Sequence, residues 1–502
     1  MSADNNKTLE ALCADALNTA GDKPAIEFEQ RWFTWGEMRQ VAEQLNETVS
    51  RLASTNAGTV RVAFIARNRP SAIAAFLAML AQRCSVRMIY PFQSSEAIAR
   101  ELDQIDADLV VAAEQDFTET LVNALREKKL SAVALSDMQA RAVLNFDRHG
   151  GDSGVAQVTI LTSGTTGKPK PFTLSYAMIA EHVVGKQRSV GARSGPLTAD
   201  APPPILMFPL GNITGLHSTL PPLVNGERLV VFDRFTIPAW LDYVARYRPV
   251  TTGLPPVGIQ MLLDANVSSE QLGSIRALGT GAAPLPPNVH RAFEERFGIP
   301  ILLSYGATEF GGPVTRMTPD LIAEWGAKKF GSVGKAIPGV SLRVIDAQSG
   351  AVLPPNSEGV LEVISPRIGS EWIRTSDLAK IDDDGFLFLL GRADGAIMRG
   401  GFKILPVTIE NALALHPAVA AVAVVGVKDR RLGEVPAAVI ELKTGASTTA
   451  EALEEHLRKH VPSTHIPLHW RILESLPRTP SMKIDLGALR RLFEAEILES
   501  TV

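Results

Sequence analysis

The segment best suited to chemistry is a short run of small, hydroxylated and basic residues, TSGTTGKPK, at 162–170. It directly follows QVTIL, a β-branched run that predicts a buried strand. Small residues let the backbone approach an anion closely, while hydroxyls, backbone N–H groups and two lysines can bind phosphate oxygens. The run therefore predicts a phosphate-binding loop. An exposed Ser/Thr/Gly turn is the alternative that this composition alone leaves open.

This loop differs from the Walker type of phosphate loop. A Walker loop needs Gly five residues before Gly167 and Ser or Thr after Lys168, but the chain has Thr162 and Pro169 at these places. Pro169 also disfavours a helix that starts directly at the loop, as Walker loops require. The rest of the chain must therefore decide between a phosphate loop and a surface turn.

Further motifs follow in a fixed order along the chain. They are TGAAPLP (280–286), SYGATEFGG (304–312), RTSDL (374–378), GRADGAIMRGGFKILPVTIE (391–410) and PRTPSMK (477–483). Together with TSGTTGKPK, they resemble the adenylate-forming superfamily, which includes acyl-CoA synthetases, firefly luciferases and adenylation domains. The resemblance covers nearly the whole chain.

The resemblance implies ATP-dependent activation of a carboxylic acid through an acyl-adenylate, followed by thioester formation, as in an acyl-CoA or aryl-CoA ligase. The implied cofactors are ATP, Mg²⁺ and coenzyme A. A carboxylic acid has a pKa of about 4 and is already ionised at neutral pH, so the first step needs no general base. It needs cancellation of negative charge and in-line positioning of the reacting groups.

The family's motifs carry catalytic and nucleotide-binding roles over to this chain. Lys483 would be the cation that touches the carboxylate and phosphate oxygens, Thr308 would contact the α-phosphate, and Glu309 would bind Mg²⁺. The predicted ATP-binding residues are Thr162, Ser163, Gly164, Thr165, Thr166, Gly167, Lys168, Gly281, Ala282, Ala283, Ser304, Tyr305, Gly306, Ala307, Thr308, Asp377, Arg392 and Lys483. Tyr305 would stack on adenine, and Asp377 would accept the ribose hydroxyls.

The resemblance also predicts where the acid and the thiol bind. The predicted acid pocket comprises Phe208, Asn212, Gly215, Thr280, Gly281, Phe310 and Gly311. Gly400, Gly401 and Phe402 would line a tunnel for the pantetheine arm of CoA, where missing side chains leave room beside the backbone. Asp394 would be the hinge about which a small domain rotates between the two steps.

Several departures from the family pattern keep alternatives open. Asn212 stands where relatives often have His, and Ser376 and Met482 each replace a usual Gly. The segment 460–470 lacks the basic stretch that often meets CoA phosphates; the cations left as candidates are Arg188, Arg193, Arg458 and Lys459. A separate carrier protein with phosphopantetheine is therefore an alternative acceptor. A non-catalytic nucleotide-binding protein is the other alternative, and acetylation of Lys483 is a hypothesis for an off switch.

The elements that must position these residues alternate between strand and helix. Strands are predicted at 61–66, 108–113, 157–162, 205–210, 228–232 and 299–304, and helices at 70–82, 213–224, 238–247, 255–264 and 286–297. Such alternation predicts parallel sheets covered by helices. After about 330, closely spaced strands predict a small antiparallel or distorted barrel unit, and an α+β unit begins near 394.

The predicted fold class is therefore α/β, with a large N-terminal domain of stacked sheets and a small barrel, and a small mobile α+β C-terminal domain. The predicted domains are 1–392, which binds ATP and the acid, and 393–502, which carries the catalytic lysine.

Composition bounds these predictions. The 502 residues are 45% hydrophobic, and 50 Lys and Arg against 54 Asp and Glu give a net charge of -4, which disfavours nucleic acid as a partner. Cys13 and Cys84 are too few for a disulfide framework. No secretory signal or membrane-spanning run is apparent, so a cytoplasmic enzyme is expected. Its oligomeric state is left open, with a homodimer as one option.

Overall fold

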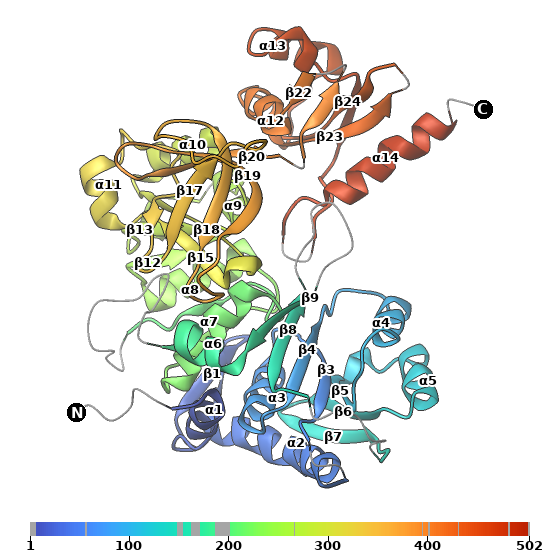
Figure 1. Cartoon of the computed structure of the whole chain (residues 1–502). Coiled ribbons are helices and arrows are strands. Elements are labelled where there is room, and N and C mark those ends of the chain that lie inside the picture. Colours follow the sequence, from blue (N-terminus) through green and yellow to red (C-terminus); the bar gives the residue numbers. More distant parts are fainter. Residues whose placement is uncertain are drawn as a thin grey trace. The chain divides into compact units, whose positions relative to one another are not determined.

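The computed structural model describes residues 7–55, 58–147, 154–161, 171–185, 201–265, 267–393, 395–399, 402–429, 431–479 and 482–499. The described residues divide into two compact units. Figure 1 labels the helices and strands along the chain. The first unit ends at Ala239 and the second begins at Trp240. The predicted domain boundary at 392–393 lies inside the second unit and stays a prediction.

The main sheet of the first unit has the strand order β7-β6-β5-β3-β4-β8-β9. Its strands are β3 (Arg61–Ile65), β4 (Ser85–Ile89), β5 (Leu109–Ala113), β6 (Ser131–Ser136), β7 (Gln139–Leu144), β8 (Gln157–Leu161) and β9 (Pro171–Ser175). The strands from β6 to β8 in this order pair in parallel, while β7 and β9 pair antiparallel at the two edges. Parallel pairing requires the helical crossovers that the alternating pattern predicts.

Helices cover both faces of this sheet. They are α2 (Trp35–Thr55), α3 (Pro70–Ala81), α4 (Ser95–Leu102) and α5 (Glu119–Glu127). In β3, Val62 and Phe64 join the core with α2 and α3, while Ala63 and Ile65 join the core with α4 and α5. Alternate residues of β3 thus enter the cores on opposite faces of the sheet. Because both faces are buried, the strand is a continuous hydrophobic run.

A smaller sheet completes the first unit, with the order β10-β11-β1-β2. Its strands are β10 (Ile205–Leu206), β11 (Leu229–Val231), β1 (Pro24–Phe28) and β2 (Arg31–Thr34); the neighbouring helices are α1 (Leu9–Leu17), α6 (Tyr176–Met178) and α7 (Ile213–Val224). The predicted strand at 205–210 is wrong in its second half, because β10 ends at Leu206. The backbone beyond it bonds instead to the side chain of Asn68.

The second unit contains a mixed sheet with the order β12-β13-β14-β15-β16. Its strands are β12 (Thr251–Gly253), β13 (Ala277–Thr280), β14 (Ile301–Ala307), β15 (Gly312–Arg316) and β16 (Lys335–Ala336); its helices are α8 (Ile237–Tyr247), α9 (Pro256–Asp264), α10 (Pro287–Phe297) and α11 (Pro319–Trp325). The predicted helices at 213–224, 238–247, 255–264 and 286–297 agree with the structure to within one residue at each end.

The segment after residue 340 first forms an antiparallel sheet with the order β17-β18-β19-β20. Its strands are β17 (Ser341–Ile345), β18 (Gly359–Ile364), β19 (Ile373–Ile381) and β20 (Leu387–Arg392). The side chains of Leu361, Val363, Ala379 and Leu387 pack with Phe310 and Val314 of the mixed sheet region. This shared core fixes β19 and β20 against β14 and β15.

The last part of the chain is the predicted α+β unit. It contains β21 (Ile397–Arg399), β22 (Phe402–Ile404), α12 (Pro406–Ala414), β23 (Val419–Asp429), β24 (Gly433–Leu442), α13 (Ala450–Arg458), β25 (His469–Leu473) and α14 (Leu486–Glu499). On β23, Val424 packs with α12 and α13, whereas Val425 packs with α14. Helices therefore cover both faces of this sheet as well. None of the helices in the described ranges is long and apolar enough to cross a membrane.

Asn68 is the polar group that ties the end of β3 to the segments after β10 and β11. Its side-chain nitrogen donates to the carbonyls of Phe208 and Phe232, each at 3.0 Å, and its oxygen accepts from the N–H of Leu210 at 2.9 Å. The residue is 6% exposed. Its amide thus satisfies buried backbone groups that form no strand ladder.

We expect Asn68→Ala to lower the free energy of unfolding by about 2–4 kcal/mol, because three hydrogen bonds are lost and buried backbone groups are left unpaired. Urea titration followed by tryptophan fluorescence measures this change. Asn225→Ala is the matched control, since Asn225 makes one exposed hydrogen bond to Pro221. Equal losses in the two variants would contradict the role of Asn68.

Candidate active site

Gly281 and Ser304 bring β13 and β14 into close contact at the site. Gly281 follows β13, and a Cβ atom there would lie 2.5 Å from Oγ of Ser304. That hydroxyl donates to the carbonyl of Thr280 at 3.1 Å. The next residue, Ala282, has a positive φ of 67°. The backbone at 281–282 is thus held in a sharp turn that only a small residue at 281 permits.

A hydrogen bond joins β14 to the antiparallel sheet, and an ion pair extends it to β20. The hydroxyl of Tyr305 donates to Oδ2 of Asp377, and Nη1 of Arg392 lies 3.9 Å from Oδ1 of the same carboxylate. Asp377 and Arg392 are directly opposite each other in the β19–β20 register. Burial and the neighbouring Asp377 raise the pKa of Tyr305, so its hydroxyl stays protonated and remains a donor. The structure thus brings together three predicted ATP-binding residues that lie far apart in the sequence.

Ser376 is a partner that sequence reasoning missed. Its Oγ accepts a hydrogen bond from Nη2 of Arg392, so the departure from the family's usual Gly adds a hydroxyl that helps to orient the guanidinium. The antiparallel pairing of β19 and β20 across a short turn could have predicted this contact, because its register sets residue 376 near residue 392.

The segment after β14 presents Thr308 and Glu309 in a 3₁₀ turn (Thr308–Phe310). The side chain of Glu309 is exposed and Thr308 is half-buried, whereas Phe310 is 2% exposed. Phe310 packs in the core shared with the antiparallel sheet, and its carbonyl accepts from Ser365 at 2.8 Å. Gly311 ends the turn with a φ of 69°. Burial of Phe310 thus anchors the turn, and its place in the acid pocket stays a prediction.

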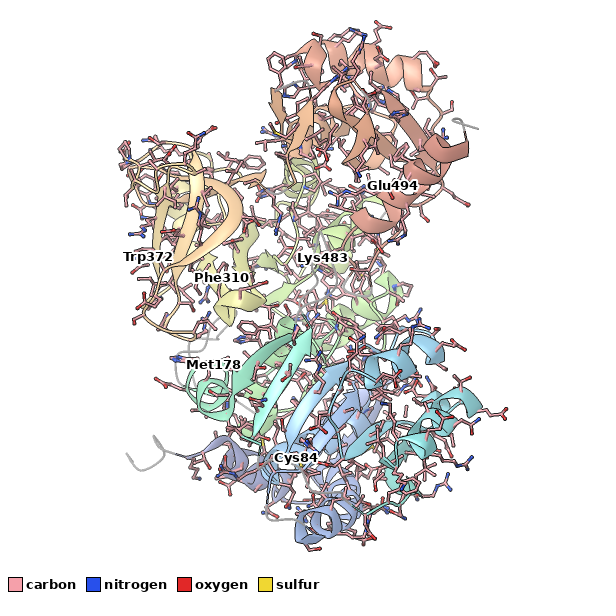
Figure 2. All side chains as sticks on the ribbon, turned by 45° about the vertical axis from the view of Figure 1, so that its right-hand side comes forward. Cys84, Met178, Phe310, Trp372, Lys483 and Glu494 are labelled. Atoms are coloured by element: carbon pink, nitrogen blue, oxygen red, sulfur yellow. The ribbon has the colours of Figure 1, made fainter. Side chains whose placement is uncertain are left out.

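Lys483, which Figure 2 labels, lies three residues before the start of α14. Its carbonyl accepts from the N–H of Thr479 at 2.7 Å, and the N–H of Met482 donates to the carbonyl of Thr479 at 2.8 Å. Met482 has a φ of 63°, in the left-handed region that Gly adopts more readily. The residue that replaces the family's usual Gly is therefore in a conformation that is uncommon for a side chain with a Cβ atom.

The ammonium of Lys483 feels the charges of Glu309 in the 3₁₀ turn and of Arg392 on β20. Burial lowers its pKa, the carboxylate of Glu309 raises it, and the guanidinium of Arg392 lowers it further. The predicted catalytic lysine is therefore coupled electrostatically to the predicted magnesium ligand Glu309 and to the predicted ATP-binding residue Arg392.

In the first unit, Asn212 and Gly215 have clear local roles. Asn212 is the N-cap of α7, and its side-chain oxygen accepts from the N–H of Gly215 at 2.7 Å. A Cβ on Gly215 would lie 2.2 Å from the carbonyl of Pro209, so no larger residue fits there. Phe208 is half-buried, and its carbonyl is bound by Asn68. Their contribution to an acid pocket stays a prediction.

Several predicted site residues lie outside the described residues. They are Thr162, Ser163, Gly164, Thr165, Thr166, Gly167, Lys168, Arg188, Arg193, Asp394, Gly400 and Gly401. The described ends of the phosphate-loop hairpin are Leu161 and Pro171, which pair across β8 and β9. The predicted tunnel residue Phe402 is 61% exposed.

The candidate cations for a CoA phosphate on α13 already have partners. Arg458 pairs with Glu454 at 2.5 Å, and Lys459 pairs with Glu455 at 3.1 Å, each one helical turn away. These pairs are exposed and therefore weak, so a phosphate could displace the carboxylates.

Two family models match the chain. The AMP-binding enzyme model matches residues 13–371, and the AMP-binding enzyme C-terminal domain model matches residues 408–483. The chain belongs to the AMP-binding enzyme family. The family predicted from TSGTTGKPK and the later motifs is thereby confirmed.

Relatives of this AMP-binding enzyme extend over nearly its whole length. 2-Succinylbenzoate–CoA ligase of Bacillus cereus is 29% identical, over 94% of this chain and 96% of that protein. 4-Coumarate–CoA ligase 1 of Petroselinum crispum is 25% identical, over 96% of this chain and 93% of that protein. ATP-bound MatB from Rhodopseudomonas palustris has a TM-score of 0.79 at 22% identity, over 97% of this chain and 99% of that chain. The predicted α/β fold class is confirmed.

The two charges near Lys483 should move its pKa in opposite directions. We expect Glu309→Gln to lower the pKa of Lys483 and Arg392→Gln to raise it, because the first change removes an attraction and the second a repulsion. The rate at which acetic anhydride modifies Lys483, followed against pH by mass spectrometry, measures both pKa values. Shifts in the same direction would show that Lys483 does not lie between these groups.

Proposed function

We propose that this AMP-binding enzyme is an acid–CoA ligase that forms AMP. The observation that carries the proposal is that the charges of Glu309 and Arg392 act on Lys483, while Arg392 forms an ion pair with the Asp377 that Tyr305 binds. The relatives named above support it, since both similar sequences carry the names of CoA ligases. ATP and Mg²⁺ are the proposed cofactors.

In the first step, an oxygen of the acid's carboxylate attacks the α-phosphorus of ATP, and the bond to pyrophosphate breaks. Tyr305 offers its ring face to adenine while its hydroxyl holds Asp377, which accepts the ribose hydroxyls. The ammonium of Lys483 neutralises the carboxylate and the α-phosphate as they approach each other. Arg392, oriented by Ser376 and Asp377, adds a second cation. No residue has to remove a proton from the acid.

Glu309 suits the magnesium site proposed for this reaction. Mg²⁺ is usually held by one or two carboxylates together with phosphate oxygens and water, and Glu309 is an exposed carboxylate whereas Asp377 is engaged by Tyr305 and Arg392. When bound, the ion would neutralise phosphate charge and orient the leaving pyrophosphate. Glu309 would hold it beside Thr308, whose hydroxyl contacts the α-phosphate.

In the second step, the CoA thiolate attacks the acyl carbon of the adenylate, the thioester bond forms, and AMP leaves. We propose that the C-terminal domain turns about Asp394, so that Lys483 withdraws and the backbone at Gly400 and Gly401 borders the pantetheine arm. Phosphopantetheine on a carrier protein would use the same chemistry. The acid itself is left to experiment.

The test is acid-dependent exchange of labelled pyrophosphate into ATP with a panel of acids that includes 2-succinylbenzoate and 4-coumarate. Thioester formation is then measured separately with CoA and with a carrier protein bearing phosphopantetheine. A folded, ATP-binding protein that shows no exchange with any acid would instead support the non-catalytic alternative.

We expect Lys483→Ala to reduce pyrophosphate exchange by at least about 100-fold, because it removes a cation needed in the adenylation transition state. Thioester formation from a supplied acyl-adenylate should fall by less than about 10-fold. Lys443→Ala, an exposed lysine of the same α+β unit, is the control and should leave both steps unchanged. Equal losses in both steps would argue against the role of Lys483.

A further inference from the structure

Asn288 connects the first turn of α10 with the last turn of α12. Its side-chain nitrogen donates to the carbonyl of Ala414 at 2.8 Å, between residues 126 positions apart in the sequence. Asn288 is the second residue of α10, which begins directly after the motif 280–286. Ala414 ends α12, and the last carbonyls of a helix have no partner within it. The bond therefore joins the predicted nucleotide-binding segment to the α+β unit at the end of the chain.

A second contact of α12 lies close to the proposed hinge in the sequence. Gly391 of β20 has a φ of 124°, and a Cβ there would lie 2.9 Å from Cγ1 of Val407 in the first turn of α12. Gly391 is three residues before Asp394. Ala414 is seven residues farther along the helix than Val407, a rise of about 10 Å. A rotation about Asp394 would therefore move Ala414 the more, and its bond to α10 would have to break.

The core of the α+β unit links the position of α12 to the position of Lys483. Leu413 of α12 packs in one core with Val424 of β23. On the other face of the same strand, Val425 packs with Ile484, the neighbour of Lys483. Close-packed cores deform little, so a contact that holds α12 also holds Lys483. In this arrangement the lysine is coupled to the charges on the 3₁₀ turn and on β20.

The bond of Asn288 is of a kind that can open in every turnover. It joins two uncharged groups, and its net contribution is small because water replaces it when it breaks. The side-chain oxygen of Asn288 is buried and has no hydrogen-bond partner among the described residues. Water would reach this oxygen once the unit turns away, which offsets part of the loss. A buried ion pair, such as Arg61 with Asp108, would instead hold one orientation throughout.

We propose that Asn288 is a positioning residue that holds the α+β unit in the orientation used for adenylation. The inference rests on the proposed function and adds the contact that has to open between its two steps. While the bond to Ala414 exists, Lys483 is held for the attack on the α-phosphorus. When the bond breaks, the unit is free to turn about Asp394 for the thioester step. Asn288 thus acts through Lys483, without touching the reacting atoms.

The first test compares pyrophosphate exchange with thioester formation from a supplied acyl-adenylate. We expect Asn288→Ala to slow exchange by about 3- to 10-fold, as the loss of one neutral hydrogen bond allows, and to leave thioester formation at or above the wild-type rate. Asn288→Asp keeps the size of the side chain and suits the positive end of the α10 dipole, but its carboxylate cannot donate to Ala414. It should therefore slow exchange at least as much without weakening the helix.

The second test needs no enzymatic activity. Spin labels are attached at Glu295→Cys on α10 and Lys443→Cys in the α+β unit, both exposed positions, while Cys13 and Cys84 are buried and stay unlabelled. Double electron–electron resonance then measures the distances between the labels. We expect either Asn288 variant to raise the population outside the wild-type distance peak by about 3- to 10-fold.

The matched control is Asn411→Ala. Asn411 is an exposed amide on α12, the helix that Asn288 binds. This variant should leave both half-reactions and the distance distribution unchanged. Changes as large as those of Asn288→Ala would overturn the inference, because any lost amide near this helix would then have the same effect.

The outcomes distinguish this inference from the proposed function. If no acid supports exchange, the ligase proposal fails, and the distance distribution still decides whether Asn288 holds the unit. In an active ligase, the inference is overturned if the Asn288 variants slow both half-reactions equally or leave their ratio unchanged, since the residue would then serve only the fold. It is also overturned if the distances stay those of the wild type.

Discussion

The hydrogen bond from Tyr305 to Asp377 joins two sheets that the chain builds far apart in sequence, and the candidate active site depends on this junction. Tyr305 lies on β14 of the mixed sheet and Asp377 on β19 of the antiparallel sheet. Because the phenol stays protonated, the carboxylate always has a donor and can keep its second oxygen toward Arg392. The shared core around Phe310 holds the sheets together around this polar contact.

The charged side chains near this junction determine which ligands the site suits. Lys483 and Arg392 are cations whose charges repel each other, and Glu309 partly compensates the lysine. Bringing together like charges costs free energy that an anionic ligand would recover. A site of this kind suits a reaction in which carboxylate, phosphate and pyrophosphate meet, since the protein has to cancel charge and has no proton to move.

Two of the three substitutions at the family's usual glycine and histidine positions have a local structural role. Ser376 binds Arg392, and Asn212 caps α7. Neither change removes a group that the proposed chemistry needs.

The sequence by itself determined the family, the element order and most element bounds. Contiguous motifs identify the family. Local hydrophobic periodicity, together with Pro and Gly signals, predicts the element order and bounds, as at the helix starts Pro70 and Pro406. It failed at 205–210, where the backbone bonds to Asn68 in place of a neighbouring strand. Only the tertiary structure decided which charges meet. Contacts such as Tyr305–Asp377 and Arg392–Ser376 depend on burial and on strand register between distant segments, and neither is encoded in the spacing of residues along the chain.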